Sequence, residues 1–305
     1  MRFLFLFALA LATALQPPPA AAEERTYLGY GRLFTNDYVG DGRDRWRSGS
    51  YQLGWVRGPD WTGELPRTMG EILEYRFRSE IVTPSNLARP DPADRRYAGV
   101  LAIGVHTHVE WSGFETRLGA DLVAVGPGTG VDDFHRRIHD ILSLPRPDRA
   151  FADQIGDAIH PTASAELGRS FALGESGSVR PFFEVQAGIE SLLRVGGDLS
   201  FGNFGRGALM MRDVVTGQRF EGVRGNRARG LSLTLGGDVA HVFDSALLPE
   251  GGAARLRDTR ERLRAGLHWR SESADVFYGV TWLGREFEGQ PEGQVLGSLK
   301  VNLRF

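Results

Sequence analysis

Apolar and polar residues alternate along many stretches of the chain. In the segment 262–270 every second residue is apolar, and all but Gly266 of the residues between them are charged or polar. The apolar positions of this segment are Leu263, Ala265, Leu267 and Trp269. The segment 101–111 also alternates, with apolar residues at Leu101, Ile103, Val105, Val109 and Trp111. Successive side chains of a strand point to opposite faces, so this period predicts β-strands with one apolar face.

About a dozen segments show this pattern, which is typical of an all-β protein. The predicted strands are 26–35, 48–57, 70–82, 97–111, 113–125, 160–172, 178–190, 195–213, 229–242, 259–271, 275–287 and 293–305. The segment 195–213 is long enough for two strands. Three longer connections, 36–47, 83–96 and 126–159, are the candidate functional loops, because loops carry most binding and catalytic residues.

The length of these segments favours a membrane barrel over a globular β-sandwich. A sandwich also gives each strand one apolar face, but its strands are about 5 to 6 residues long. Several segments here reach the roughly 9 to 11 residues of a tilted transmembrane strand. The chain also ends on a strand with Phe305, as is typical of outer-membrane barrels. We therefore predict a transmembrane antiparallel β-barrel of about 12 strands with one short extracellular loop helix.

The N-terminal residues have the order of a secretory signal peptide. Arg2 precedes an apolar run from Phe3 to Leu15, and small residues follow at 20–22 before Glu23. The run is shorter than the roughly 20 apolar residues of a spanning helix, so strands must do any spanning. We predict that residues 1–22 are a signal peptide and that residues 23–305 form a single barrel domain in the cell outer membrane.

The composition excludes two classes of site. The chain has no cysteine, so it forms no disulfide and no thiolate metal site. Lys plus Arg number 36 and Asp plus Glu number 38. This balance gives no basis for nucleic-acid binding, which relies on an excess of positive charge.

The connection 126–159 contains one segment with the pattern of a helix. Phe134, Ile138 and Leu142 recur at the spacing of one helix face, and His135 and His139 lie one turn apart beside them. A histidine pair at this spacing can bind a metal ion, although no glutamate lies between the two. The alternative is a surface helix that packs its apolar stripe on the barrel wall and exposes both histidines.

Five short motifs occur in an order that resembles one enzyme family. They are Asn36-Asp37, Asp44-Arg45-x-x-Ser48, Thr83-Pro84-Ser85, Gly126-Pro127 with His139, and Ala150-Phe151-x-Asp153-Gln154-Ile155. Together they resemble the outer-membrane lipid A 3'-O-deacylases over most of the mature chain. The resemblance implies a twelve-stranded barrel with its site near the outer membrane surface, against a helix of an extracellular loop. It also implies calcium-dependent hydrolysis of the 3' ester of lipid A in the outer leaflet, and we expect a monomer.

The resemblance assigns roles to particular residues. His139 matches the catalytic histidine of the family, and a histidine with a pKa near neutrality suits proton transfer from water. Asn36, Asp37 and Ser48 match other site positions, where Ser48 replaces a threonine. The Asp37 carboxylate is the expected Ca2+ ligand, with Asp41 beside it, because calcium prefers oxygen ligands.

The basic and acidic positions of the family are matched less completely. Arg89 falls at a basic position of the family, and we expect it, with Arg95 and Arg96, to meet the phosphates of lipid A. The acidic position six residues after His139 is occupied by Pro145. Arg146 follows it, and Asp148 is the nearest acidic substitute.

Two other functions use the same residues differently. An outer-membrane phospholipase-like serine acyl hydrolase would use Ser48 or Ser50 as a nucleophile beside the histidine, and the serine would be acylated. A non-enzymatic porin-like barrel would have a water-filled lumen, and its function would not depend on His139.

Overall fold

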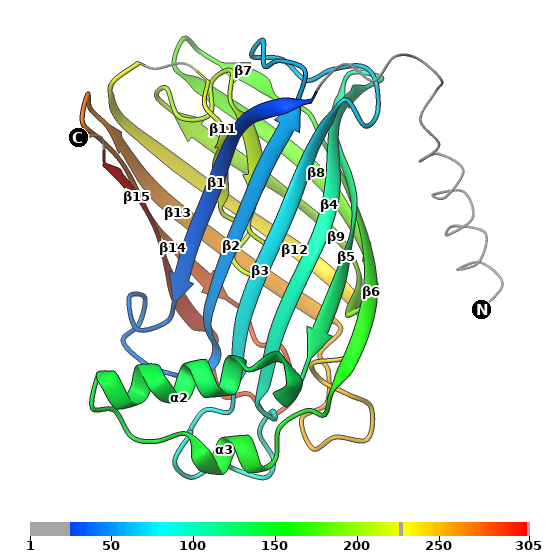
Figure 1. The fold of residues 1–305 in the computed structure, drawn as a ribbon, viewed down its shortest axis with the longest axis vertical. Coiled ribbons are helices and arrows are strands. Elements are labelled where there is room, and N and C mark those ends of the chain that lie inside the picture. The colour runs from blue at the N-terminus through cyan, green and yellow to red at the C-terminus, as the bar shows by residue number, and fades with distance from the viewer. Residues whose placement is uncertain (1–24, 226–227, 304–305) are drawn as a thin grey trace, which may run out of the picture.

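The computed structural model describes residues 25–225 and 228–303, so the predicted signal peptide and Phe305 lie outside the described residues. Twelve long antiparallel strands form a closed barrel, which confirms the predicted fold (Figure 1). The long strands are β1 (Thr26–Asn36), β2 (Trp46–Gly58), β3 (Ile72–Thr83), β4 (Ala98–Trp111), β5 (Phe114–Val125), β6 (Ala158–Gly168), β8 (Gly177–Ala187), β9 (Glu190–Phe201), β12 (Gly230–Ser245), β13 (Thr259–Arg270), β14 (Ala274–Leu283) and β15 (Gln294–Leu303). A short strand, β7 (Phe171–Leu173), pairs with β8.

The strands follow one another around the wall with few exceptions. The order is β6-β5-β4-β3-β2-β1-β15-β14-β13-β12-β9-β8, and β6 pairs with β8. β1 and β15, from the two ends of the chain, pair with Phe34 opposite Leu299. Closure gives every long strand a partner on both sides, and this pairing satisfies backbone groups that lipid could not.

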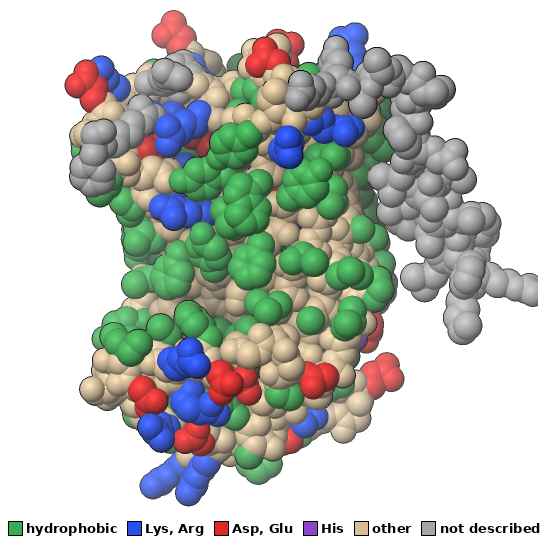
Figure 2. All heavy atoms as spheres, in the orientation of Figure 1, with side chains coloured by type: hydrophobic (Ala, Val, Ile, Leu, Met, Phe, Trp, Pro, Cys, Tyr) green, Lys and Arg blue, Asp and Glu red, His purple; other side chains and the backbone are tan. Residues whose placement is uncertain are grey.

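The strands point their apolar residues outward and their polar residues inward. In β13, Leu263 and Trp269 are 61% and 48% exposed, whereas Arg264 is 6% exposed. Figure 2 shows hydrophobic side chains in a band across the middle of the visible face, with charged side chains at both ends. This polarity is the reverse of a water-soluble sandwich and fits a wall that faces lipid.

A hairpin inside the barrel fills part of the lumen. β10 (Leu209–Arg212) and β11 (Arg219–Val223) form a separate two-stranded sheet between β9 and β12 in the chain. Arg212 of the hairpin binds Glu166 and Asp198 of the wall at 2.9 and 2.8 Å. Gln52 of β2 donates to the Arg212 carbonyl at 3.0 Å, and Gln218 donates to the Ala265 carbonyl of β13 at 3.1 Å. The hairpin therefore connects opposite parts of the wall.

The segment 195–213 contains parts of two strands, as its length allowed, but only the first, β9, belongs to the barrel wall. The wall strand β9 ends at Phe201, and the chain then turns into the lumen. Gly202 adopts a φ of 101°, which glycine tolerates and other residues rarely adopt. The Ser232 Oγ accepts the backbone N–H of Asn203 at 3.0 Å and holds the turn. An alternating pattern does not show whether a strand pairs with the wall or with its own hairpin.

Three short helices lie at one end of the barrel, here called the helix end, and the start of β1 lies at the opposite end (Figure 1). They are the 3-10 helix η1 (Pro127–Thr129), α2 (Val131–Ile141) and α3 (Asp148–Ala152). The sequence predicts one helix here, and α3 was missed because five residues are too few to show a helical period. In the described part of the chain, none of the helices has the length and apolarity to cross a bilayer.

Candidate active site at the helix end

α2 packs against the ends of β3 and β4 (Figure 1). Gly99 of β4 allows a close approach, because a Cβ added there would lie 2.7 Å from the Val131 Cβ. The Gly126 N–H donates to the Gly99 carbonyl at 3.0 Å before the helix begins. Gln154 Nε2 donates to Asp132 Oδ2 at 3.0 Å and joins the first turn of α2 to the residues after α3. These contacts fix the helix on the barrel.

The two histidines of α2 face the protein, and its apolar stripe faces outward. His135 and His139 are each 4% exposed, whereas Phe134 and Leu142 are 57% and 61% exposed. The alternative prediction, a helix with its stripe on the wall and exposed histidines, is therefore wrong. At a membrane surface an apolar helix face can turn toward lipid instead of toward the protein.

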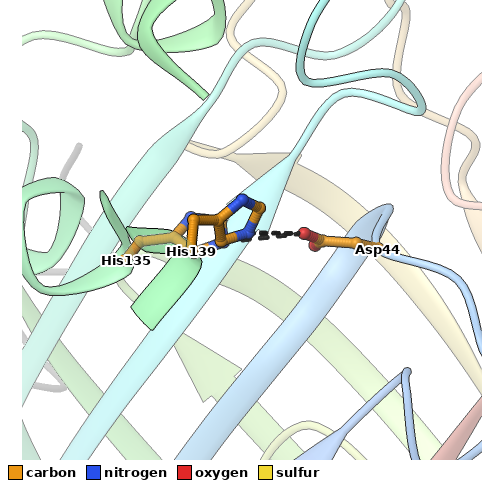
Figure 3. Close-up of side chains that lie close together, drawn as sticks. All are labelled: Asp44, His135 and His139. Carbon is orange, nitrogen blue, oxygen red and sulfur yellow. Dashed lines mark hydrogen bonds and ion pairs between the residues drawn. The ribbon is translucent and has the colours of Figure 1, made fainter. Parts of the chain in front are cut away.

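His139 uses both ring nitrogens in hydrogen bonds. Nδ1 lies 2.6 Å from the Pro145 carbonyl oxygen, and Nε2 lies 2.9 Å from Asp44 Oδ2 (Figure 3). A carbonyl oxygen only accepts, so Nδ1 carries the hydrogen. Nε2 is therefore the nitrogen that can take up or release a proton. The resemblance places an acidic residue at the position of Pro145. Here the backbone carbonyl oxygen of Pro145, not a side chain, accepts the hydrogen bond from His139.

Asp44 lies just before β2 and connects the first hairpin to α2. Its Oδ1 accepts the Ser48 hydroxyl at 2.6 Å, and its Oδ2 also lies 3.7 Å from His135 Nε2. Burial acts to raise the pKa of Asp44, but its contacts with His135, Ser48 and His139 outweigh burial, and the pKa lies below its usual range. No role was predicted for Asp44 from the sequence. Its place four residues before Ser48, in one of the five motifs, was the available signal.

Asn36 and Ser48 hold the first hairpin together. Asn36 Nδ2 donates to the Ser48 carbonyl at 3.0 Å, and Asn36 Oδ1 accepts the Tyr38 N–H at 2.9 Å. The structure thus brings Asn36, Ser48 and His139 together around Asp44, as a connected chain of hydrogen bonds. In this arrangement Asn36 fixes the backbone, and Ser48 fixes the Asp44 carboxylate.

Asp37 is fully buried directly after β1. Its Oδ2 accepts the Arg45 N–H at 2.7 Å, whereas its Oδ1 has no hydrogen-bond partner in the described part of the chain. Burial raises the pKa of Asp37 to about 9, although the Arg45 N–H opposes this shift. A buried carboxyl oxygen without a partner suits a cation ligand. Asp37 therefore fits the calcium role that the resemblance gives it.

Four other predicted residues lie outside the hydrogen-bond chain around Asp44. Asp41 Oδ2 accepts from Arg45 Nη2 at 2.8 Å, so its charge is already paired. Arg89 is exposed in the connection between β3 and β4. The prediction that Arg95 meets phosphates is wrong, because its guanidinium is buried and binds Glu286 at 2.5 Å. Arg96 is exposed and binds Asp153 at 2.9 Å.

A family model described as outer membrane protein LpxR matches residues 4–305. The chain belongs to the LpxR family. This LpxR-family protein is located in the outer membrane. Outer-membrane barrels have their longer connections on the extracellular side, and the connection with α2 and α3 lies at the helix end. This rule predicts that the helix end, with Asp44 and His139, faces the outside of the cell.

Comparison with solved structures agrees with the barrel fold. The structure of LpxR from Salmonella typhimurium has a TM-score of 0.74 and 18% sequence identity, and the match covers 91% of this chain and 100% of that chain. The KdgM porin in complex with disordered oligogalacturonate has a TM-score of 0.40 and 7% identity, with 92% and 99% covered. The beta domain of the Bordetella autotransporter BrkA has a TM-score of 0.40 and 12% identity, with the same coverage. A comparison of this LpxR-family sequence with curated proteins found no match.

Proposed function

We propose that this LpxR-family protein is a lipid A 3'-O-deacylase, an ester hydrolase that removes the 3'-linked acyloxyacyl chain. The observation that carries the proposal is the contact between His139 of α2 and Asp44 of the first hairpin, at the outer end of an outer-membrane barrel. The ester bonds of lipid A in the outer leaflet lie at about the depth of the helix end of the barrel. The family match and the ordered motifs around these residues support the same substrate.

In the proposed reaction, the neutral form of His139 accepts at Nε2 a proton from the water that attacks the ester carbonyl, and later gives it to the sugar oxygen that leaves. The Nδ1–H bond to the Pro145 carbonyl holds the ring in the required tautomer. Asp44, 2.9 Å from Nε2, stabilises the imidazolium that forms. Ser48 donates to the other oxygen of Asp44 and fixes its orientation.

Asp37 is the residue we propose as a Ca2+ ligand, because its Oδ1 is buried and has no partner among the described residues. If bound there, calcium would supply positive charge that stabilises the negative charge developing on the ester carbonyl oxygen. Asp41 stays a predicted ligand, and its ion pair with Arg45 would have to open for it to take part. Arg89 stays the predicted phosphate contact, since it is exposed near this end of the barrel.

The outward face of α2 supports a lipid substrate. Phe134, Ile141 and Leu142 are 57%, 75% and 61% exposed on the helix whose other face carries His139. An amphipathic helix of this kind lies in the membrane interface with its apolar face among acyl chains. We propose that these residues contact acyl chains of lipid A while its ester reaches the histidine.

The contacts of Ser48 argue against a serine acyl hydrolase. In such an enzyme the histidine lies between the serine and the carboxylate and takes the serine proton. Here the carboxylate of Asp44 lies between Ser48 and His139, and the Ser48 hydroxyl donates to it. The inner hairpin with its ion pairs likewise occupies part of the lumen that a porin would keep open.

Mass spectrometry of lipid A from outer membranes that contain the protein tests the proposal. We expect loss of the 3' chains with the wild type, and retention of these chains with His139→Ala or after calcium chelation. His160→Ala is the matched control, because His160 lies in β6 outside the cluster. Intact 3' chains with the wild type would refute the activity. Loss of these chains with His139→Ala would refute the role of the histidine.

A further inference from the structure

Four arginines and three glutamates form a buried cluster in the lumen at the helix end, here called the arginine cluster. None of their side chains is more than 13% exposed. They come from β2, β3, β9 and β13, and from the connections that precede β4 and β15. The members are Arg47, Arg78, Glu80, Arg95, Glu190, Arg260 and Glu286. Charges this far from water need partners of opposite sign.

The three glutamates form ion pairs only with arginines of the arginine cluster, among the residues that the structure describes. Glu286 binds Arg95 at 2.5 Å and Arg47 at 3.0 Å. Glu190 binds Arg260 at 2.7 Å, and the remaining glutamate binds two arginines of the cluster. Four positive charges thus meet three negative charges, and the arginine cluster keeps a net charge of +1.

The arginines of the cluster carry more N–H donors than its carboxylates accept. Arg95 and Arg260 each have a buried Nε and a buried Nη2 without an acceptor in the described part of the chain. Burial and the charges of Arg47 and Arg260 lower the pKa of Arg95 below its usual range, although Glu286 opposes the shift. Positive charge is therefore in excess around Arg95. A water molecule can accept these hydrogen bonds, but an anion also balances the charge.

A cavity of about 50 Å³ lies beside the arginine cluster and is lined by Arg47, Arg260 and Glu286. Asp238 also lines it, but this carboxylate is already paired with Arg262 at 2.9 Å. A volume of this size holds a particle as small as a water molecule or a halide ion and excludes a sugar phosphate. We infer that the arginine cluster binds one small monovalent anion of the size of chloride.

Anion binding at the arginine cluster stabilises the folded barrel. Its side chains meet only when four wall strands and two connections are in place, so the unfolded chain has no such site. A ligand of the folded state alone raises the melting temperature Tm as its concentration rises. This stabilisation is separate from the proposed hydrolysis, because the arginine cluster contains neither His139 nor Asp44.

The test compares the Tm of the full mature chain in detergent in sodium bromide and in sodium gluconate at equal ionic strength. Bromide has nearly the size of chloride, whereas gluconate is too large for the cavity. We expect bromide to raise the Tm of the wild type by about 2 to 4 °C. Arg95→Gln removes the excess positive charge, so this rise should disappear. Arg67→Gln is the matched control and should keep the rise, because the Arg67 side chain is 90% exposed between β2 and β3.

Glu190→Gln tests the charge argument in the opposite direction. The change raises the excess positive charge of the arginine cluster, so we expect bromide to raise the Tm at least as much as in the wild type. General effects of the two salts on protein solvation act on every variant, so the difference between variants reports the site. An equal rise in Arg95→Gln and the wild type would overturn the site, as would a smaller rise in Glu190→Gln than in the wild type.

Anomalous scattering from crystals of the wild type grown in bromide locates the ion, and it is decisive even if a variant does not fold. We expect a bromide peak within hydrogen-bond distance of Arg95 or Arg260. Bromide at other positions only would overturn the inference and would make ordered water the acceptor of these N–H groups. Neither measurement uses lipid A, so both stand if the proposed hydrolysis fails.

Discussion

Replacement of Asp44 by asparagine tests the link between the first hairpin and α2. The asparagine side chain keeps the size and most of the packing of the aspartate, but the change removes the negative charge 2.9 Å from His139 Nε2. If His139 accepts a proton during hydrolysis, this charge stabilises the imidazolium in the transition state and has little effect on substrate binding. We therefore expect Asp44→Asn to lower kcat with little change in KM.

The size of this effect follows from the geometry. Two unit charges about 4 Å apart near a protein surface interact by about 4 kcal/mol. The Asp44 side chain is 28% exposed, so solvent screens part of this attraction. About 2 to 3 kcal/mol remains, which corresponds to a decrease in kcat of roughly 30- to 150-fold. His139→Ala should lower kcat further, by about 10²- to 10⁴-fold.

Initial rates of 3' chain release from lipid A in mixed micelles give these values. Asp140→Asn is the matched control, because Asp140 is exposed on α2 and binds Arg146 rather than a histidine. Circular dichroism checks that each variant keeps its strand content. A kcat for Asp44→Asn equal to that of the wild type would refute the reasoning, as would an equal loss in Asp140→Asn.

Three other changes give separate tests of the site. Ser48→Ala removes a hydroxyl that orients Asp44, so we expect a loss of about 10-fold in kcat. Ser48→Thr keeps the hydroxyl and should keep the rate. Complete loss of activity in Ser48→Ala, together with acylation of the wild-type serine, would indicate a serine nucleophile. Asp37→Asn resembles the neutral acid that a pKa of about 9 implies at pH 7. Its Tm without calcium should match the wild type, and the rise in Tm that calcium gives the wild type should disappear; a retained rise would place the ion elsewhere. Gly99→Val would bring a side chain against Val131, 2.7 Å from the added Cβ. We therefore expect activity to fall at least as far as in Asp44→Asn, measured beside Gly156→Val, where the added Cβ meets nothing within 4 Å.

The barrel could be predicted from the sequence because strand alternation is a local pattern. The residues Leu263 and Arg264 already show which positions face lipid and which face the lumen. For α2 the sequence left two arrangements open, and the one that packed Phe134 on the barrel wall is wrong. In a helix at the membrane surface, as in the strands, the apolar face turns away from the protein.

The contacts of the site could be predicted only in part. His139, Ser48 and Asn36 were found from a family resemblance, and the structure joins them through Asp44. Asp44 and His139 are separated by 95 positions in the chain, and their contact depends on where α2 lies on β3 and β4. No local pattern encodes that placement. Pro145 looked like the loss of a functional residue, but its backbone carbonyl accepts a hydrogen bond from His139.

The hairpin inside the barrel has a mechanical consequence for the site outside it. Gln52 of β2 binds one side of the hairpin, and Gln218 of the hairpin binds β13. These strands are separated in the wall by β1, β15 and β14. The hairpin therefore acts as an internal brace, and lateral pressure from the lipid cannot flatten the cross-section without breaking these bonds. β2 also follows Asp44 and contains Ser48, so the brace keeps one half of the candidate site at a constant depth and angle while lipids move around it.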